Sequence, residues 1–479
     1  MNYKMIVRVL GYVMLIIAGL MLFPLIAGLC YGESVTNFII TIAVTALVGF
    51  LMSRVKPVRQ EIFARDGFAI VGIAWILMSL LGAIPFVLSG DIPSYVDAVF
   101  ETVSGFTTTG ASVVLNVEEM SRGCLFWRLF THWIGGMGML VFIMAVMPLS
   151  GEHSMHIMRA EIPGPTVGKL VPRAKKTALI LYMIYAGLTI LETILLLCGG
   201  MSFFDAILHA FATAGTGGFS TRAASVGAYN SLYIEIVIAT FMLIFAVNFN
   251  LYFLILIGKV KAALSSEELH VFICMVGIAV AGIAIAISPI YGGFFKALRY
   301  AYFNVATVVS TAGFGTADFT QWPALTQWIL VMLMFVGGCA GSTGGGLKLS
   351  RVILVIKAAA ADVRQMIFPR SVTVARIDGK RVDEGTVRAA YTYFALYILF
   401  LIGVTMLISV DGWDVTTNFT ATVSCLSNIG PGLGLVGPSG SFSIFSDFSK
   451  VVLSIAMLLG RLEIYPILVL VVPTMWRRK

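Results

Sequence analysis

Four short polar segments recur along this chain, and each closes on a glycine. They read Thr107-Thr108-Thr109-Gly110, Gly215-Thr216-Gly217-Gly218, Ser310-Thr311-Ala312-Gly313 and Ser427-Asn428-Ile429-Gly430. The closing glycines stand 108, 95 and 117 residues apart, so one unit of roughly a hundred residues occurs four times. Four such segments around one axis would offer rings of backbone carbonyl oxygens, which can replace the hydration shell of a cation.

The glycine in each segment lets the carbonyls turn toward an axis, because glycine reaches backbone angles that other residues rarely adopt. Two positions earlier stands the residue that we predict at the cation site, which is Thr108, Thr216, Thr311 or Asn428. A threonine there either adds a hydroxyl ligand or braces the segment. Ordinary small-residue helix contacts are the alternative, but they do not explain four copies in matching context. The predicted filter comprises Thr107, Thr108, Thr109, Gly110, Thr216, Gly217, Gly218, Thr311, Ala312, Gly313, Asn428, Ile429 and Gly430.

Each segment follows a short apolar stretch that we expect to be a half-helix entering from the external side. The predicted half-helices are 94–106, 202–213, 294–309 and 413–425. Their C-terminal ends would point inward, and each such end carries about half a negative charge. Irregular backbone at this depth persists only where protein covers it or where it lines water. The pattern therefore favours a cation near the membrane centre with no acidic side chain beside it.

The composition is that of a polytopic membrane protein. Of 479 residues, 59% are hydrophobic and 12% charged, about half of the roughly 25% charged residues usual in soluble domains. Ten apolar runs are long enough to cross ~30 Å of hydrocarbon: 6–31, 35–52, 67–89, 124–149, 178–199, 231–258, 269–290, 325–360, 387–410 and 449–473. We expect an all-α fold with four tandem repeats of helix, half-helix, filter and helix around one pore. The predicted divisions are an N-terminal hairpin (1–60) and pore repeats at 61–150, 151–262, 263–370 and 371–479.

The placement of charge speaks against a nucleic-acid partner, although the formal net charge is +8. Of the 32 Lys and Arg residues, 25 lie near the two termini or in alternate connections between the apolar runs. This is the positive-inside pattern of membrane proteins, so both termini are expected in the cytoplasm. The six cysteines show neither disulfide nor metal spacing. No grouping of nucleophile, acid and base suggests an enzyme, and no cofactor is expected in this chain.

Several stretches match the motifs of one transporter family. They are Phe126-Trp127-Arg128, 133–138, 215–221, 337–348, 428–434 and Gly460-Arg461. With them the chain resembles the Trk/Ktr/HKT superfamily of potassium transporters, in particular its TrkH-type membrane subunits, over essentially its whole length. The resemblance implies potassium as the transported ion and a homodimer in the bacterial inner membrane with one ion path per subunit. It also implies a cytosolic ring of nucleotide-binding regulatory subunits of the TrkA kind.

The third unit carries six glycines in the ten residues from Gly337 to Gly346. A regular helix is disfavoured there, since each glycine costs up to about 1 kcal/mol relative to alanine. The run differs from a phosphate-binding loop because Leu347 separates Gly346 from Lys348 and no Ser or Thr directly follows the lysine. The resemblance implies an intramembrane gate below the filter, with a simple kink as the alternative. The predicted gate residues are Gly341, Gly344, Gly345, Gly346, Lys348 and Arg461.

Arg461 lies halfway along the last apolar run. A charge at that depth costs at least ~2.5 kcal/mol unless it is paired or faces water. Glu463 is only two positions away, so it lies on a different helix face and is not an obvious partner. The resemblance suggests that Arg461 projects into the pore as an electrostatic barrier. An ion pair with another helix is the alternative.

Other polar residues receive broader predictions. Four should lie near the outer mouth, where cation attraction and half-helix capping stay equally open: Asp97, Glu101, Asp205 and His209. His153 and His156 have no carboxylate or thiol neighbour that would make a metal site. The basic connections 150–177 and 347–388 should dock a cytosolic partner, and they would also attract lipid headgroups.

These features together predict uptake of potassium down its electrochemical gradient through a gated, channel-like pore. A pore that passes sodium nearly as well as potassium is an alternative that the sequence does not decide, because corresponding filter positions hold different residues. The sequence also does not decide whether transport is coupled to a second ion. A secondary transporter of an organic solute would show inverted repeats, whereas the four units here share one orientation.

Overall fold

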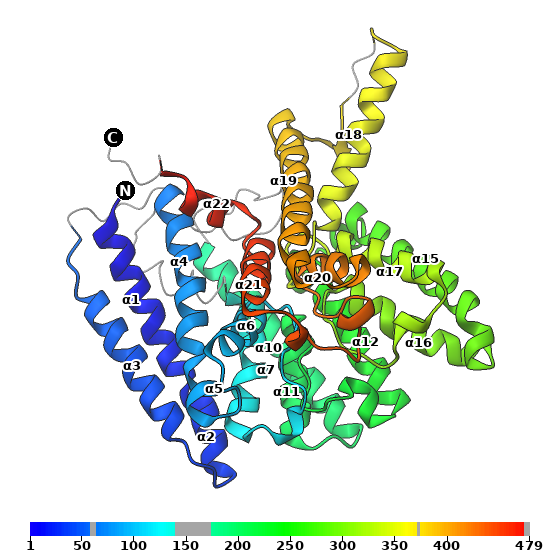
Figure 1. Ribbon diagram of the computed structural model, residues 1–479. Helices are drawn as coiled ribbons and strands as arrows, with labels where there is room; N and C mark the ends of the chain where they lie inside the picture. Colours follow the sequence, from blue (N-terminus) through cyan, green and yellow to red (C-terminus); the bar gives the residue numbers. More distant parts are fainter. Residues whose placement is uncertain (58–63, 139–173, 371–373, 474–479) are drawn as a thin grey trace.

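The computed structural model describes residues 1–57, 64–138, 174–370 and 374–473, and they are almost entirely helical (Figure 1). The one sheet in this part of the chain is an antiparallel hairpin of β1 (Arg376–Ile377) and β2 (Lys380–Arg381), in which Arg376 pairs with Arg381. Six helices here are long and apolar enough to cross a membrane, and a bent pair of helices makes a seventh span. The predicted all-α, multi-pass fold class is confirmed.

The N-terminal hairpin packs on one flank of the first repeat (Figure 1). It consists of α1 (Tyr3–Leu20), α2 (Leu22–Cys30) and α3 (Thr36–Ser53). A methyl group on Gly11 of α1 would lie 2.7 Å from the Gly49 carbonyl oxygen of α3, and one on Gly49 would lie 2.9 Å from the Gly11 oxygen. The two backbones therefore touch through small residues, as is typical inside membranes. Further contacts join α1 to α4 (Ala64–Gly82) and α2 to α7 (Arg122–Gly136).

Four short helices occupy the positions predicted for the half-helices, to within two residues at either end. They are α6 (Tyr95–Phe106), α11 (Phe203–Gly215), α16 (Phe294–Val309) and α20 (Val415–Ser427). The side chains of Ser94, Ser202 and Asp414 cap three of them by accepting the amide proton three residues on. Such a cap stabilises a helix by about 1 kcal/mol. The third copy, α16, starts instead after Gly292 and Gly293, without a side-chain cap.

A long helix leads into each half-helix and packs against it, so the same unit is built four times. These incoming helices are α4 with its short continuation α5 (Ile84–Ser89), α10 (Ala174–Cys198), α15 (Glu267–Tyr291) and α19 (Glu384–Ile408). The half-helix of one repeat also contacts the returning helix of another: α11 packs on α7, α16 on α12 (Leu232–Ala246) and α6 on α21 (Asp447–Arg461). The repeats therefore interlock around a common centre.

The returning helices are broken. The prediction of continuous crossings at 231–258 and 449–473 is wrong, whereas the break expected at the glycine run within 325–360 is present. The first bends by 89° between α12 and α13 (Phe249–Leu256), and the short α14 (Val260–Leu264) follows. The second is split into α17 (Ala324–Val336) and α18 (Leu349–Ile367), and the third into α21 and α22 (Tyr465–Val471). Asn248 caps α13, the glycine run separates α17 from α18, and Glu463 and Ile464 turn the chain with φ angles of 56° and 67°. Apolar length alone does not reveal such breaks.

The half-helices are buried although they are rich in hydroxyl groups. In α20 every residue from Thr417 to Ser427 except Phe419 is buried. The Thr420 hydroxyl donates to the Thr416 carbonyl at 2.7 Å, and the Thr422 hydroxyl donates to the Asn418 carbonyl at 3.0 Å. Because these two bonds stay within the helix, they satisfy buried hydroxyls of α20 without a partner from another element.

Candidate functional site

The four glycine-closed segments share one backbone conformation. The residues at the predicted cation positions have φ angles of 55°, 56°, 60° and 56° in chain order, and the closing glycines have 79°, 76°, 80° and 103°. The residue between them keeps a negative φ in every copy. Positive φ is uncommon for residues with a side chain, so its recurrence is a property of the repeated unit. An alternation of positive and negative φ is compatible with a carbonyl-lined ion path.

The segments meet in a closed ring. In chain order each glycine faces the carbonyl oxygen of the middle residue in the next segment: Gly110 faces Gly217, Gly218 faces Ala312, Gly313 faces Ile429 and Gly430 faces Thr109. A methyl group on any of the first three glycines would overlap that oxygen, and one on Gly430 would lie 2.8 Å from it. The fourth contact returns to the first segment. The ring therefore requires glycine both for its backbone angle and for its lack of a side chain.

One hydrogen bond, repeated four times, ties the ring to its half-helices. The middle residue of each segment donates its amide proton to the carbonyl five residues earlier: Thr109 to Ser104 (2.8 Å), Gly217 to Ala212 (2.9 Å), Ala312 to Thr307 (2.9 Å) and Ile429 to Ser424 (2.9 Å). The amide is thus used inside the repeat, while the carbonyl of the same residue faces its neighbour in the ring. The negative ends of four half-helices converge at the same place.

Side chains at the four predicted cation positions differ, in contrast to the backbone. The Thr216 hydroxyl donates to the Gly215 carbonyl at 2.6 Å, and the Thr311 hydroxyl accepts the Gly345 amide at 2.7 Å. Asn428 donates to Thr109 and Met457, so it braces the first segment against α21. The Thr108 hydroxyl has no hydrogen-bond partner among the described residues. The side chains of Thr216, Thr311 and Asn428 therefore brace the structure, and the ligand role stays a prediction.

The predicted gate loop, from Gly337 to Lys348, lies directly against the third and fourth segments. A methyl group on Gly344 would lie 2.9 Å from the Ser310 carbonyl oxygen, and one on Gly345 would overlap the Ser427 oxygen. These contacts fall at the beginning of the segments, where the half-helices end. The loop thus underlies half of the ring.

The bend between α12 and α13 of the same chain holds this loop through backbone hydrogen bonds. The Cys339 amide donates to the Ala246 carbonyl at 2.9 Å, and the Phe249 amide donates to the Gly341 carbonyl at 3.0 Å, so the bend between α12 and α13 receives the loop. The buried Lys348 ammonium donates to the Gly344 carbonyl. Left-handed φ angles at Gly341 (72°), Gly346 (78°) and Lys348 (70°) shape its turns.

Arg461 reaches from the last residue of α21 to two other repeats. Its guanidinium donates to the Thr343 carbonyl of the loop at 2.7 Å and to the Gly135 carbonyl at the end of α7 at 2.6 Å. Glu463 pairs instead with Arg351 of α18. As predicted, it is not the partner of Arg461, but the reason is that α21 ends at Arg461 and Glu463 lies in the break that follows. Arg461 therefore joins the loop to the first repeat through neutral acceptors.

The comparison with known proteins identifies the family. Residues 33–273 and 295–478 match the TrkH family, whose description is cation transport protein. The chain belongs to this family. A relative from Halomonas elongata, the Trk system potassium uptake protein TrkH, is 35% identical over 485 residues and the full length of both chains. The TrkG protein of Escherichia coli is 32% identical over 99% of both chains.

A solved structure supports the same conclusion. The crystal structure of the potassium transporter TrkH from Vibrio parahaemolyticus superposes on this chain with a TM-score of 0.90, at 33% identity and over the full length of both chains. The resemblance predicted from the motifs is confirmed, and so is the fold class of four repeats with an N-terminal hairpin. The family consists of cation transporters, which are not a class of enzymes.

The predicted outer-mouth residues take part in structural networks. Asp97 pairs with Lys450, Glu101 with Arg128, and Asp205 accepts from the Thr221 hydroxyl at 2.6 Å and from Arg222. His209 bonds to the Ser220 hydroxyl at 3.0 Å and to the Asp205 carbonyl at 2.8 Å. These contacts are ion pairs and hydrogen bonds rather than the predicted half-helix caps, since Ser94 and Ser202 cap α6 and α11.

Two basic residues in this part of the site received no predicted role from the sequence, namely Lys450 and Arg128, of which the latter was noted only within a family motif. The signal for them was available, because both lie outside the basic connections, and Arg128 lies inside an apolar run. A charge in such a run requires a partner. His153, His156 and most of the connection 150–177 lie outside the described residues.

Proposed function

We propose that this chain carries potassium ions into the bacterial cell across the inner membrane through a gated, channel-like pore. The observation that supports this most is the closed ring of four segments with one backbone conformation. Relatives from Halomonas elongata and Escherichia coli are named Trk system potassium uptake proteins. The proposal narrows the family's cation transport to one ion and one path.

In this proposal the ion exchanges its water for the carbonyl oxygens of the ring. The four half-helix ends contribute about half a negative charge each, so the site attracts a cation without an acidic side chain. Since the hydroxyls of Thr216 and Thr311 are hydrogen-bonded elsewhere, these two residues act through their carbonyls. The Thr108 hydroxyl is able to turn toward the ion.

The gate in this proposal is the loop from Gly337 to Lys348, held by Arg461. Opening moves the loop away from Thr311 and Ser427 and breaks the bond from Arg461 to Thr343. A hydrogen bond to a charged group contributes roughly 1.5–3 kcal/mol. The free energy of a few such contacts is similar to a typical coupling free energy between two sites. A regulatory protein that binds the open and closed states with different affinity can supply this free energy. The positive charge of Arg461 opposes a cation until the loop moves.

Serine substitution of the closing glycines tests the filter. Gly110→Ser, Gly218→Ser, Gly313→Ser and Gly430→Ser should each lower the preference for potassium over sodium, because the ring leaves no room for a side chain. Flux of each ion into liposomes gives the ratio. Gly277→Ser is the matched control, since a side chain at Gly277 would meet no atom within 4 Å. Unchanged ratios in all four variants would contradict the filter.

A less selective conduit for potassium and sodium, or an ion-coupled symporter, is the second candidate. The observation that favours it is the unequal use of side chains around the ring, where Asn428 and Thr311 brace and Thr108 does not. An asymmetric ring need not fit one ion radius equally at four sides. Flux under separate potassium, sodium and proton gradients distinguishes the candidates. Only a coupled carrier moves potassium against the electrochemical gradient of potassium.

Assembly and orientation complete the proposal. We place both termini in the cytoplasm, because the basic residues cluster in alternate connections. The chain would form a homodimer and dock nucleotide-binding subunits of the TrkA kind on the basic connections, where anionic lipids also bind. Size determination in detergent tests the dimer, and binding of the purified regulatory subunit with and without nucleotide tests the docking surface.

A further inference from the structure

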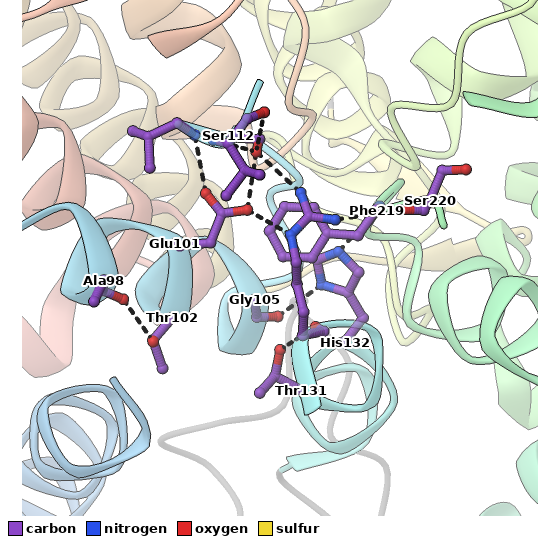
Figure 2. Close-up of polar contacts among 12 residues, drawn as sticks. Ala98, Glu101, Thr102, Gly105, Ser112, Thr131, His132, Phe219 and Ser220 are labelled. Atoms are coloured by element: carbon purple, nitrogen blue, oxygen red, sulfur yellow. Dashed lines mark hydrogen bonds and ion pairs between the residues drawn. The ribbon is translucent and has the colours of Figure 1, made fainter. Parts of the chain in front are cut away.

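A cluster of buried ionisable side chains lies beside the ring, on the first returning helix, α7. His132 and Arg128 lie on this helix, and Glu101 of the half-helix α6 pairs with Arg128. Figure 2 shows Glu101 and His132 on the two sides of this cluster. The exposed fractions of His132, Arg128 and Glu101 are 0%, 3% and 1%. Ionisable groups at membrane depth are costly and mark functional sites. Neither the predicted filter nor the predicted gate includes His132.

The Glu101 and Arg128 pair holds the outer ends of the first two segments. Nε of Arg128 lies 2.6 Å from Glu101 Oε1, and the other Glu101 oxygen accepts the Val113 amide at 2.9 Å. The guanidinium also donates to the Ser112 hydroxyl at 3.0 Å and stands 3.6 Å from the centre of the Phe219 ring. Ser112 and Val113 follow the first segment, and Phe219 follows the second. The charges neutralise each other where the two segments leave the ring.

His132 connects the same two repeats closer to the ring. Its Nε2 lies 3.2 Å from the Phe219 amide nitrogen, which can only donate, so Nε2 is the acceptor. Nδ1 therefore carries the proton and donates to the Gly105 carbonyl, 2.8 Å away, near the end of the first half-helix. The imidazole of His132 also packs on Gly217, where an added methyl group would overlap the imidazole. One neutral imidazole thus bonds to both repeats.

We propose that His132 is a positioning residue that sets the ion preference of the ring by holding the first and second segments in register. This inference rests on the proposed function, because it assumes that the ring selects the ion. Gly217 supplies the carbonyl that faces Gly110, and the imidazole supports Gly217 from behind. Positions of ring oxygens determine how well they replace the water of a given ion. A side chain that fixes one segment against the next therefore affects selectivity without touching the ion.

Three variants of His132 in the full chain test this. His132→Gln keeps an acceptor near the position of Nε2, His132→Asn keeps only a donor near Nδ1, and His132→Leu removes both. Loss of one hydrogen bond is equivalent to roughly tenfold at most. Because His132→Leu loses two, it should lower the potassium-to-sodium preference by about tenfold or more. His132→Gln should stay near the unsubstituted protein and His132→Asn should fall between them. The measurement is the ratio of potassium, rubidium and sodium flux into liposomes, with KM and maximal rate for each ion.

Parallel variants keep the result interpretable. His270→Leu, at an exposed position on α15, should leave the ratio unchanged. A purely structural role would lower the maximal rate of all ions equally, whereas positioning changes the ratio and the KM for potassium. If His132→Leu does not assemble, the comparison of Gln with Asn decides, and an Asn variant with the unsubstituted ratio overturns the proposal. Gly218→Ser in the same assay separates the two hypotheses. If Gly218→Ser does not change the ion ratio, the filter itself is refuted. If Gly218→Ser changes the ratio and the His132 variants do not, only the proposed role of His132 is refuted.

Discussion

The ring and the loop beneath it are built on opposite principles. The ring repeats one backbone conformation and one hydrogen bond in all four units, and each unit contacts the next. The loop belongs to the third unit alone, and its hydrogen bonds do not repeat one pattern. Repetition gives equivalent oxygens around an axis, which suits coordination of a spherical ion. A single departure from the repeat gives an element that can move without disturbing the rest.

The two regions differ in what holds them, although both pack closely, since a methyl group on Gly345 of the loop would also overlap a carbonyl oxygen. Three of the four ring glycines face a neighbouring carbonyl so closely that a methyl group would overlap it. Hydrogen bonds from side chains and backbone to carbonyl oxygens also hold the loop, as in the contact of Arg461 with Thr343. Water in an opening pore can replace such partners at small net cost. We therefore expect substitutions in the ring to affect ion preference and substitutions around the loop to affect rate.

The largest effect is expected from Gly218→Ala in the ring. The added methyl group would overlap the Ala312 oxygen and force the second and third segments apart. A displacement of about 1 Å at a reacting or binding centre can cost roughly a hundredfold, so potassium uptake should fall by about that factor. Growth of a potassium-uptake-deficient strain at limiting potassium measures it. Gly277→Ala serves as the control, and near-normal growth of the Gly218 variant would break the distinction between ring and loop.

Shortening the loop by Gly344, Gly345 and Gly346 should have the next largest effect, with the opposite sign. The missing residues include those against Ser310 and Ser427, so the remaining loop no longer underlies the ring. A shift of ~1.4 kcal/mol toward the open state would raise flux about tenfold. The potassium-to-sodium ratio should not change. A lower or unaltered flux in liposomes would show that the loop is a structural kink.

Arg461→Gln should raise flux by a smaller factor, about threefold to tenfold, because charge-assisted bonds to Thr343 and Gly135 become neutral ones. Arg461→Lys, which keeps the charge but loses the planar fork, should fall between. Single-channel or liposome flux at several potassium concentrations checks this. If both variants conduct less than the unsubstituted protein, Arg461 supports the open path rather than the closed one.

The smallest effect is expected from Glu463→Gln, which weakens the pair with Arg351 across the break between α21 and α22. The break holds Glu463 and Ile464 in left-handed conformations that are strained for residues with side chains. Relaxing it should raise flux about twofold, since a partly exposed pair contributes at most about 1 kcal/mol. Glu267→Gln, which weakens the pair of Glu267 with Lys357 on α18, is the matched control. Equal responses of the two variants would mean that the break has no special role.

Much of the architecture was predictable because its signals are local. Ser202 precedes Asp205 at the spacing of a helix cap, and α11 begins where this pattern predicts. The glycines at positions 110, 218, 313 and 430 mark left-handed turns that few other residues tolerate. The breaks within 231–258 and 449–473 were missed because an apolar run does not show where its backbone turns, whereas the glycine run at 337–346 marked the break between α17 and α18. Glu463 and Ile464 adopt positive φ although nothing in their residue types requires it.

The sequence by itself determined the membrane class, the four repeats, the ends of the half-helices and the filter glycines. All of these follow from composition, periodicity or the steric properties of single residues. Only the tertiary structure decided which polar side chains brace the ring, since Asn428 and Thr109 stand 319 positions apart and meet at 3.0 Å. The same holds for His132, whose partner Phe219 is 87 positions away. A hydrogen bond depends on distance in space, and the repeats must close into a ring before these distances exist.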